Sequence, residues 1–207
     1  MKKVVFVLLA VFVLISCGGN GSNSMKKAEK EEDKLEIAIS NAENAEITEK
    51  EIFLGFRFGM SESQVDSLFE DLLSSNKIYT NSNGSYQYDF NTETYNFHIN
   101  FVPNYYDGEL YEMLYPLTNT LMPSSKDYVF MALPFIRSER GKTFEKFTTK
   151  DVLGDEVYTN IKGNLIVSFY SGAKAIMKYS NAPIAKIVSN IEEQKKQEKA
   201  NESSLNF

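Results

Sequence analysis

The chain has no tryptophan, one cysteine and one histidine, and these shortages exclude several kinds of site. Because Cys17 is the only thiol, no internal disulfide and no cysteine-based metal centre can form. Because His98 is the only imidazole, a multi-histidine metal centre is excluded too, and a nucleophilic serine would have a single histidine available as its base. We therefore expect no metal and no cofactor, and a domain held together by its core.

Signatures of catalysis are missing as well. No Gly-x-Ser-x-Gly sequence occurs, and Ser61 is better explained as the cap of a helix than as a nucleophile. Neighbouring carboxylates such as Glu70 and Asp71 fall on the flank of that helix, and the Gly18-Gly19 pair has no strand or helix beside it to form a phosphate loop. We therefore expect a protein that is not an enzyme and has no catalytic residues.

Basic charge is also in short supply. The chain has 22 basic and 28 acidic side chains, a formal net charge of −6. Without residues 1–16 it loses Lys2 and Lys3, which leaves 20 basic side chains and a charge of −8. Nucleic acids and anionic lipid surfaces are bound by clustered Lys and Arg, so this balance argues against both as electrostatic partners.

The amino terminus has the pattern of a secretory signal. Two lysines precede an unbroken apolar run, Val4 to Ile15, which is too short to cross a bilayer as a permanent helix. The run ends in Leu14-Ile15-Ser16-Cys17, which resembles the lipobox of bacterial lipoproteins.

That resemblance implies cleavage after Ser16, a thioether-linked diacylglycerol on Cys17 and acylation of the new amino terminus. Two or three acyl chains anchor a protein almost permanently without a membrane-spanning segment. We expect a lipid-anchored protein of the cell envelope. Gly18 does not resemble the aspartate that retains some lipoproteins in the inner membrane, which favours the outer membrane and leaves open which face it occupies.

Residues 17–50 and 192–207 read as segments outside the folded domain. The first begins with small polar residues and continues with Lys/Glu runs in which Leu35, Ile39 and Ala42 have a helical spacing. This indicates a flexible, partly helical tether. The second is a charged run that we expect to be a frayed tail. A single domain over residues 51–191 remains, and its length leaves no room for a second full domain.

A helix is predicted from residue 61, because Ser61 and Gln64 form a capping box. Its buried face follows the i, i+3, i+4, i+7 rule and comprises Val65, Leu68, Phe69 and Leu72. The helix should end at residues 74–76.

Three strands are predicted after that helix, over residues 86–90, 95–102 and 109–117, the last following an Asp107-Gly108 turn. Their apolar residues alternate, which indicates an antiparallel meander with one covered face and one partly wet face.

The chain then repeats this plan. A helix-start signal at residues 123–127 leads into a predicted helix over 128–140, where Pro134 would kink or split it unless this stretch is extended. Strands are predicted over residues 156–161, 165–170 and 173–179, before an amphipathic helix that starts near Ile184. The fold class is therefore α+β, an antiparallel sheet covered by helices, with a possible tandem α-β-β-β repeat over residues 52–118 and 123–180.

The stretch Leu54 to Val65, with its Gly-Met-Ser opening and Gln64-Val65 three residues later, resembles a known group. It is similar to β-lactamase-inhibitor-protein-like domains and to the small outer-membrane lipoproteins that serve the β-barrel assembly machinery. The resemblance implies the tandem α-β-β-β fold and a non-catalytic role in the envelope. It transfers no individual functional residue.

A tyrosine cluster beside the Asp107-Gly108 turn is the best candidate binding surface, comprising Tyr105, Tyr106, Tyr111 and Tyr115. Tyrosine offers a large contact area and a polar tip, although ordinary packing explains part of such a cluster. We expect a module that binds another envelope protein. The alternatives are a binder of a small ligand or glycan and, less favoured, an enzyme that acts on envelope polymers.

Overall fold

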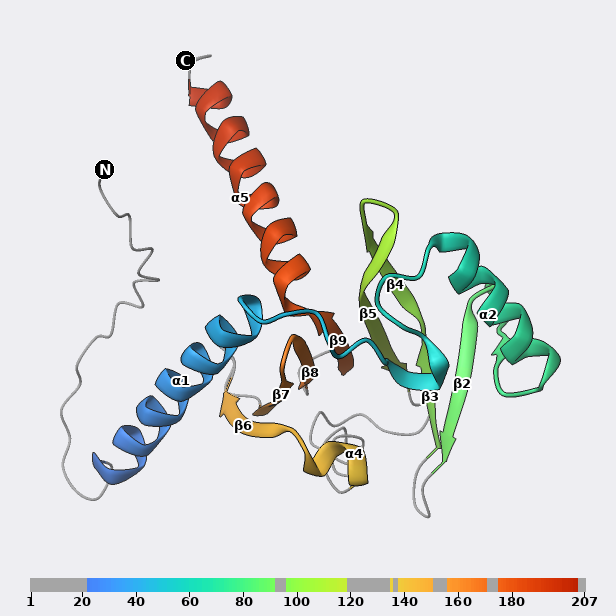
Figure 1. Ribbon diagram of the computed structural model, residues 1–207, viewed down its shortest axis with the longest axis horizontal. Coiled ribbons are helices and arrows are strands. Elements are labelled where there is room, and N and C mark those ends of the chain that lie inside the picture. Colours follow the sequence, from blue (N-terminus) through green and yellow to red (C-terminus); the bar gives the residue numbers. More distant parts are fainter. Residues whose placement is uncertain are drawn as a thin grey trace.

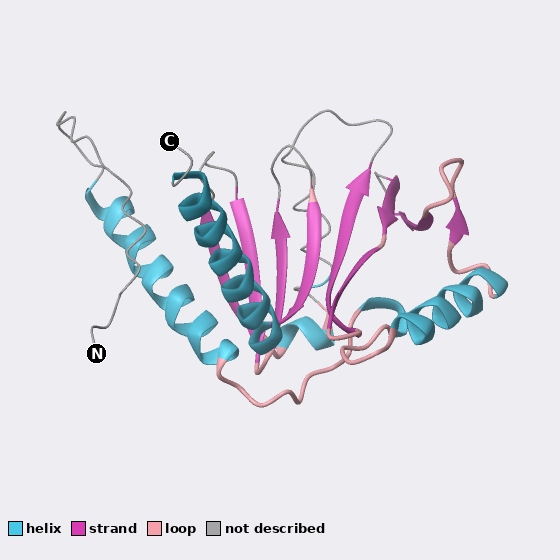
Figure 2. Ribbon diagram, turned by 90° about the horizontal axis from the view of Figure 1, so that it is seen from above, coloured by secondary structure: helices cyan, strands magenta, loops and turns pink. Residues whose placement is uncertain are grey.

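The computed structural model describes residues 22–91, 96–118, 135, 138–150, 156–170 and 175–204. It is an α+β fold, as predicted: an open antiparallel sheet with helices on both faces (Figures 1 and 2). The described helices are α1 (Ser22–Glu43), the short 3-10 helix η1 (Phe53–Gly55), α2 (Glu62–Ser74), α4 (Glu139–Lys142) and α5 (Ala182–Ser204). The described strands are β1 (Tyr79–Thr80), β2 (Tyr86–Asn91), β3 (Asn96–Asn100), β4 (Val102–Tyr106), β5 (Glu109–Thr118), β6 (Glu145–Lys150), β7 (Glu156–Lys162), β8 (Leu165–Tyr170) and β9 (Ile176–Asn181).

The strands follow the order β1-β2-β3-β5-β9-β8-β7-β6, and β4 pairs with β5. The predicted strand over residues 95–102 is β3 and the start of β4, which pair with opposite ends of β5. The turn between β4 and β5 lies at Asp107 and Gly108, which have φ of 52° and 77°. Two successive positive φ values match the twist of a tight hairpin, so the predicted Asp-Gly turn is confirmed.

This hairpin contains a bulge at Tyr111. Asn104 pairs with Glu112 while Tyr105 pairs with Leu110, which leaves Tyr111 as the extra residue of β5. A bulge re-aims side chains locally. Here it allows both Leu110 and Met113 to be buried in the core, at 1% and 0% exposure, although they are an odd number of residues apart.

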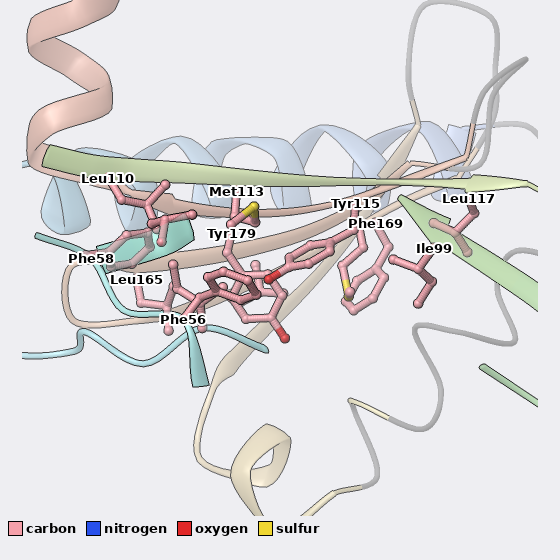
Figure 3. Packing of buried hydrophobic residues seen from close by; sticks show 14 of the residues in the cluster. Phe56, Phe58, Ile99, Leu110, Met113, Tyr115, Leu117, Leu165, Phe169 and Tyr179 are labelled. Carbon is pink, nitrogen blue, oxygen red and sulfur yellow. The ribbon is translucent and has the colours of Figure 1, made fainter. Parts of the chain in front are cut away.

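The main core lies on one face of the sheet. Figure 3 shows Leu110, Met113, Tyr115 and Leu117 of β5 pointing to the side where Phe56 and Phe58 lie. The helix α2 packs on this face through Val65, Phe69 and Leu72. Its predicted capping box is present, since the Gln64 amide donates to Ser61 and the Ser61 amide donates to the Gln64 side chain. The predicted bounds of this helix are confirmed.

The opposite face carries α1 and α5. A smaller cluster joins Ala38 and Ala42 of α1 to Phe147, Ile161 and Ala182. The prediction that residues 17–50 form a tether outside the folded domain is therefore wrong for α1, which packs on the sheet. Small alanines bring the helix backbone close to the sheet, although they give a thin apolar stripe in the sequence.

The charged segment that follows β9 is more helical than predicted. α5 continues through Ser204, so the charged run from residue 192 that the sequence indicated as frayed is helical in the structure. Its outer part projects from the sheet, and residues 192–201 are all exposed (Figure 1).

The second half of the predicted repeat is described in part. β7 and β8 match their predictions within a residue, and β9 begins at Ile176. Strand β6 was not predicted. Most of the predicted helix over 128–140, including Pro134, lies outside the described residues. Only Phe135 and residues 138–140 of this range are described, and the last two of these begin α4.

Candidate functional site

An open groove of about 790 Å³ lies between the sheet, α1 and α5. Its floor is formed by the face of β4 to β9 opposite the main core, and its walls are side chains of the two helices. A volume of this size is in the range of ligand-binding sites.

The floor contains three almost buried hydroxyl residues, Thr159, Ser168 and Ser180; the first two are 5% and 3% exposed. Thr159 and Ser168 are direct neighbours on β7 and β8. Neither side chain has a hydrogen-bond partner among the described residues. In that part of the chain, every side-chain oxygen or nitrogen that is fully closed off from solvent does have a partner, so these two hydroxyls are not fully closed off. Both hydroxyls are therefore accessible from the groove and can bond to a ligand.

A partly buried carboxylate, Glu112 of β5, also lines the groove and pairs across the sheet with Ser180 of β9. Its Oε1 accepts from Asn104 Nδ2 at 2.9 Å, and its Oε2 accepts from Ser180 Oγ at 2.7 Å. Lys178 Nζ lies 3.6 Å from the same Oε2, and the side chains of Glu112 and Lys178 are 15% and 30% exposed. These bonds fix the carboxylate and give the groove floor a defined polar pattern.

The helix walls combine apolar and charged side chains. Leu35 and Ile39 of α1 and Val188 of α5 are among the apolar side chains that line the groove. Glu43 and Lys186 also line the groove, and Lys186 Nζ lies 3.1 Å from Glu43 Oε2. This ion pair joins the two helices.

Three tyrosines line the groove from different strands: Tyr105 of β4, Tyr111 of β5 and Tyr170 of β8. Tyr111, the bulge residue, lies near Glu112 and Glu192, and burial followed by these two carboxylates raises the pKa of its phenol. Tyr170 is 36% exposed, with Lys178 Nζ 5.9 Å from the centre of its ring. Exposed aromatic rings that line a polar groove suit contact with a polymer or a protein segment.

The predicted tyrosine cluster is divided among three environments. Tyr106 and Tyr111 line a second cavity beside the β4–β5 turn. Tyr105 lines the groove and also packs against the main core, and burial, then Asp66 and Glu62 of α2, raise its pKa to about 12. Tyr115 is fully buried, with 0% exposure, and offers no contact surface because β5 turns this side chain to the main core.

His98 belongs to a hydrogen-bonded group at the β1–β2–β3 end of the sheet. Its Nδ1 lies 2.7 Å from Asp89 Oδ1 and 2.9 Å from the hydroxyl of Tyr79, which donates to the same Asp89 oxygen. These contacts give the imidazole a structural role. Over the described ranges, no group of three or more His, Cys, Asp or Glu side chains is placed to hold a metal ion.

The predicted lipid site, Cys17, lies outside the described residues. Within the part of the chain that the structure describes, no helix combines the length and apolarity needed to cross a membrane.

Sequence reasoning missed most of the groove. Thr159, Ser168 and Ser180 come from three strands, and they share a face only because of the register between β7, β8 and β9. A local signal of alternation exists only at Ser168, which stands between Val167 and Phe169; Thr159 and Ser180 are each followed by an asparagine.

Comparison with known proteins gives no relative. No protein-family model, no curated protein and no solved structure matches the chain.

Proposed function

We propose that the chain is a lipid-anchored lipoprotein of the bacterial cell envelope that binds another envelope protein without catalysing a reaction. The lipobox-like sequence ending at Cys17 supports the anchor, and the outer membrane is the membrane it favours. The observation that carries the binding role is the groove between the sheet, α1 and α5.

An extended protein segment suits this groove for two reasons. The groove is open and reaches from Thr149 on β6 to Asn104 on β4, so a chain can lie across the strands. Its lining offers hydroxyls, a fixed carboxylate and tyrosine rings, the groups that hold main-chain amides and side chains at protein contacts.

Site-specific photo-crosslinking in intact cells tests this proposal. A benzophenone side chain at Ser189, an exposed lining residue on α5, should give a discrete adduct with one envelope protein. The same side chain at Asp71, which is exposed on α2 away from the groove, is the matched control. Adducts of equal yield from both positions, or none from Ser189, would contradict the proposal.

A further substitution ties the adduct to the groove. Ala185 lines the groove from α5, so Ala185→Trp should fill part of it and reduce the Ser189 adduct severalfold. An undiminished adduct would place the partner elsewhere.

A second candidate, a small-ligand or glycan binder, is supported by one specific observation. Thr159 and Ser168 present hydroxyls to the groove that no described protein group satisfies, and sugars bond through such groups. Titration calorimetry of the full chain with soluble envelope glycan fragments tests it. Saturable heat that Ser168→Val abolishes would favour the glycan over the protein partner.

A further inference from the structure

The second cavity, about 330 Å³ in volume, lies where the segment before α2, the β4–β5 turn and the start of α5 meet. Tyr106 and Tyr111 line it. Its volume is near the lower limit of small-molecule sites, which span about 300 to 1,000 Å³. A ligand of this cavity would be much smaller than a protein segment.

The apolar part of this cavity is rigidly built. Phe58 and Leu110 line it and are 3% and 1% exposed. Their two segments are tied by backbone hydrogen bonds, because Gly59 donates to the carbonyl of Leu110 at 2.9 Å and Leu110 donates to the carbonyl of Met60 at 2.8 Å. The cavity is therefore largely preformed, which lowers the entropic cost of binding.

Charges of opposite sign line this cavity from different segments. Lys50 comes from the segment before α2, whereas Asp107 and Glu109 come from the β4–β5 hairpin. None of the three takes part in an ion pair within the described ranges. The Glu109 carboxylate also lies near the backbone of Gly59, since its Oε2 would be 3.9 Å from a Cβ built there.

A buried amide adds a directed donor. Asn181 lines the cavity and is 4% exposed. Its Oδ1 accepts from Asn164 Nδ2 at 3.4 Å, while its own Nδ2 has no partner among the described residues. Among the described residues, every side-chain nitrogen that is fully closed off from solvent has a hydrogen-bond partner. Because this Nδ2 has none, it is not fully closed off. It is free to donate to a molecule in the cavity.

We propose that this cavity binds a small zwitterion of the α-amino acid class. Lys50 and the Asn181 amide hold its carboxylate, Glu109 and Asp107 hold its ammonium group, and its apolar side chain contacts Phe58 and Leu110. An inorganic anion would pair with Lys50 and the amide alone, and a simple cation with the two carboxylates alone, whereas a zwitterion can contact both sets. The proposal is independent of what occupies the groove.

Titration calorimetry of the full chain with three probes tests the assignment. L-leucine carries both charges, L-leucine amide lacks the carboxylate, and N-acetyl-L-leucine lacks the ammonium group. L-leucine should bind about tenfold more tightly than either analogue, the effect of one charged contact. Lys50→Met should remove the preference over the amide, and Glu109→Gln should reduce the preference over the N-acetyl form.

Matched variants control for changes in total charge. Lys77→Met and Glu70→Gln alter exposed residues at or near the end of α2 and should leave all three affinities unchanged. In nuclear magnetic resonance spectra, L-leucine should shift the Asn181 side-chain amide signal and leave the backbone amides of Thr159 and Ser168 in place.

Three results would overturn the proposal. They are no saturable binding of L-leucine at millimolar concentration, equal affinity for all three probes, and shifts confined to Thr159 and Ser168, which would place the ligand in the groove. In each case the photo-crosslink from Ser189 still tests the proposed protein partner separately.

Discussion

Removal of the Asn164 side chain should destabilise the protein more than any exposed asparagine substitution. Asn164 is 0% exposed and lies in the β7–β8 connection. Its Oδ1 accepts from the amides of Thr48 and Glu49 at 3.0 and 2.8 Å, and its Nδ2 donates to the Glu49 carbonyl at 2.9 Å. These bonds attach the segment that leads from α1 into the main core.

The cost of Asn164→Ala follows from the groups left behind. Two backbone amides, the Glu49 carbonyl and the Asn181 Oδ1 lose their partner, the last through a long bond of 3.4 Å, and an unsatisfied buried group costs about 1–3 kcal/mol. Thr48 is exposed and Glu49 is half-buried, so water reaches these groups and the lower end of that range applies. We expect a loss of about 3 kcal/mol in the free energy of unfolding, measured by urea denaturation of the full chain at an unchanged m-value.

Two further variants separate hydrogen bonding from packing. Asn190→Ala, at an exposed position of α5, should change stability by less than about 0.5 kcal/mol. Asn164→Asp keeps the shape and the two accepted bonds, but it sets an anion against the Glu49 carbonyl and the Asn181 Oδ1.

The aspartate variant should therefore be destabilised at neutral pH and recover as the pH falls. Its folded state would bind a proton more tightly than the unfolded chain, and protonation restores one donor. A loss below about 1 kcal/mol for Asn164→Ala, or wild-type stability of Asn164→Asp at neutral pH, would refute the reasoning.

The remaining predictions concern the core, alkaline pH and the groove. Tyr115→Phe should cost about 1 kcal/mol or less, because the hydroxyl donates to the Phe53 carbonyl at a long 3.5 Å, whereas Tyr115→Ala should cost about 3–5 kcal/mol by urea denaturation; equal costs would contradict the packing. Burial raises the pKa of Tyr179 from 10.0 to about 12, so the folded state keeps a proton that the unfolded chain loses above pH 10. Stability should then fall as the pH rises, by about 1.4 kcal/mol near pH 11, and Tyr179→Phe should remove that part of the slope in denaturation series. Glu112→Gln should cost about 1 kcal/mol, since an amide cannot accept from both Asn104 and Ser180 and loses the ion pair with Lys178; it should also weaken the Ser189 photo-crosslink, and an unchanged adduct would remove Glu112 from the binding surface.

Elements with local signals were predictable from the sequence. The capping box at Ser61 and Gln64 defined the start of α2, and the Asp107-Gly108 pair defined the β4–β5 turn. Such signals depend on residues a few positions apart, so they need no knowledge of the rest of the chain.

Elements whose stability comes from distant contacts were missed. Strand β6 has a single apolar residue, Phe147, and gains its partners from β7 and α1. The docking of α1 rests on Ala38 and Ala42, whose small size matters only against a sheet that comes later in the sequence. Asn164 has turn chemistry in the sequence, and its bonds to residues 48 and 49 arise only from the folded arrangement.

The candidate site was predictable only in part. Tyr111 was named from its residue type, but its place in the groove depends on the bulge in β5. Tyr115 was named with it, and the same strand buries Tyr115 in the main core. The polar floor required the register of β7, β8 and β9, which no local pattern specifies.

The most direct test of an anchored binding module combines fractionation with the crosslink from Ser189. Cells carrying the benzophenone at Ser189 would be compared with and without Cys17→Ala, and the adduct and the protein would be measured in membrane and soluble fractions. We expect that the protein leaves the membrane fraction without Cys17 and that the adduct decreases with it. Protein that remains in the membrane fraction without Cys17, or an adduct equal to that from Asp71, would contradict this expectation.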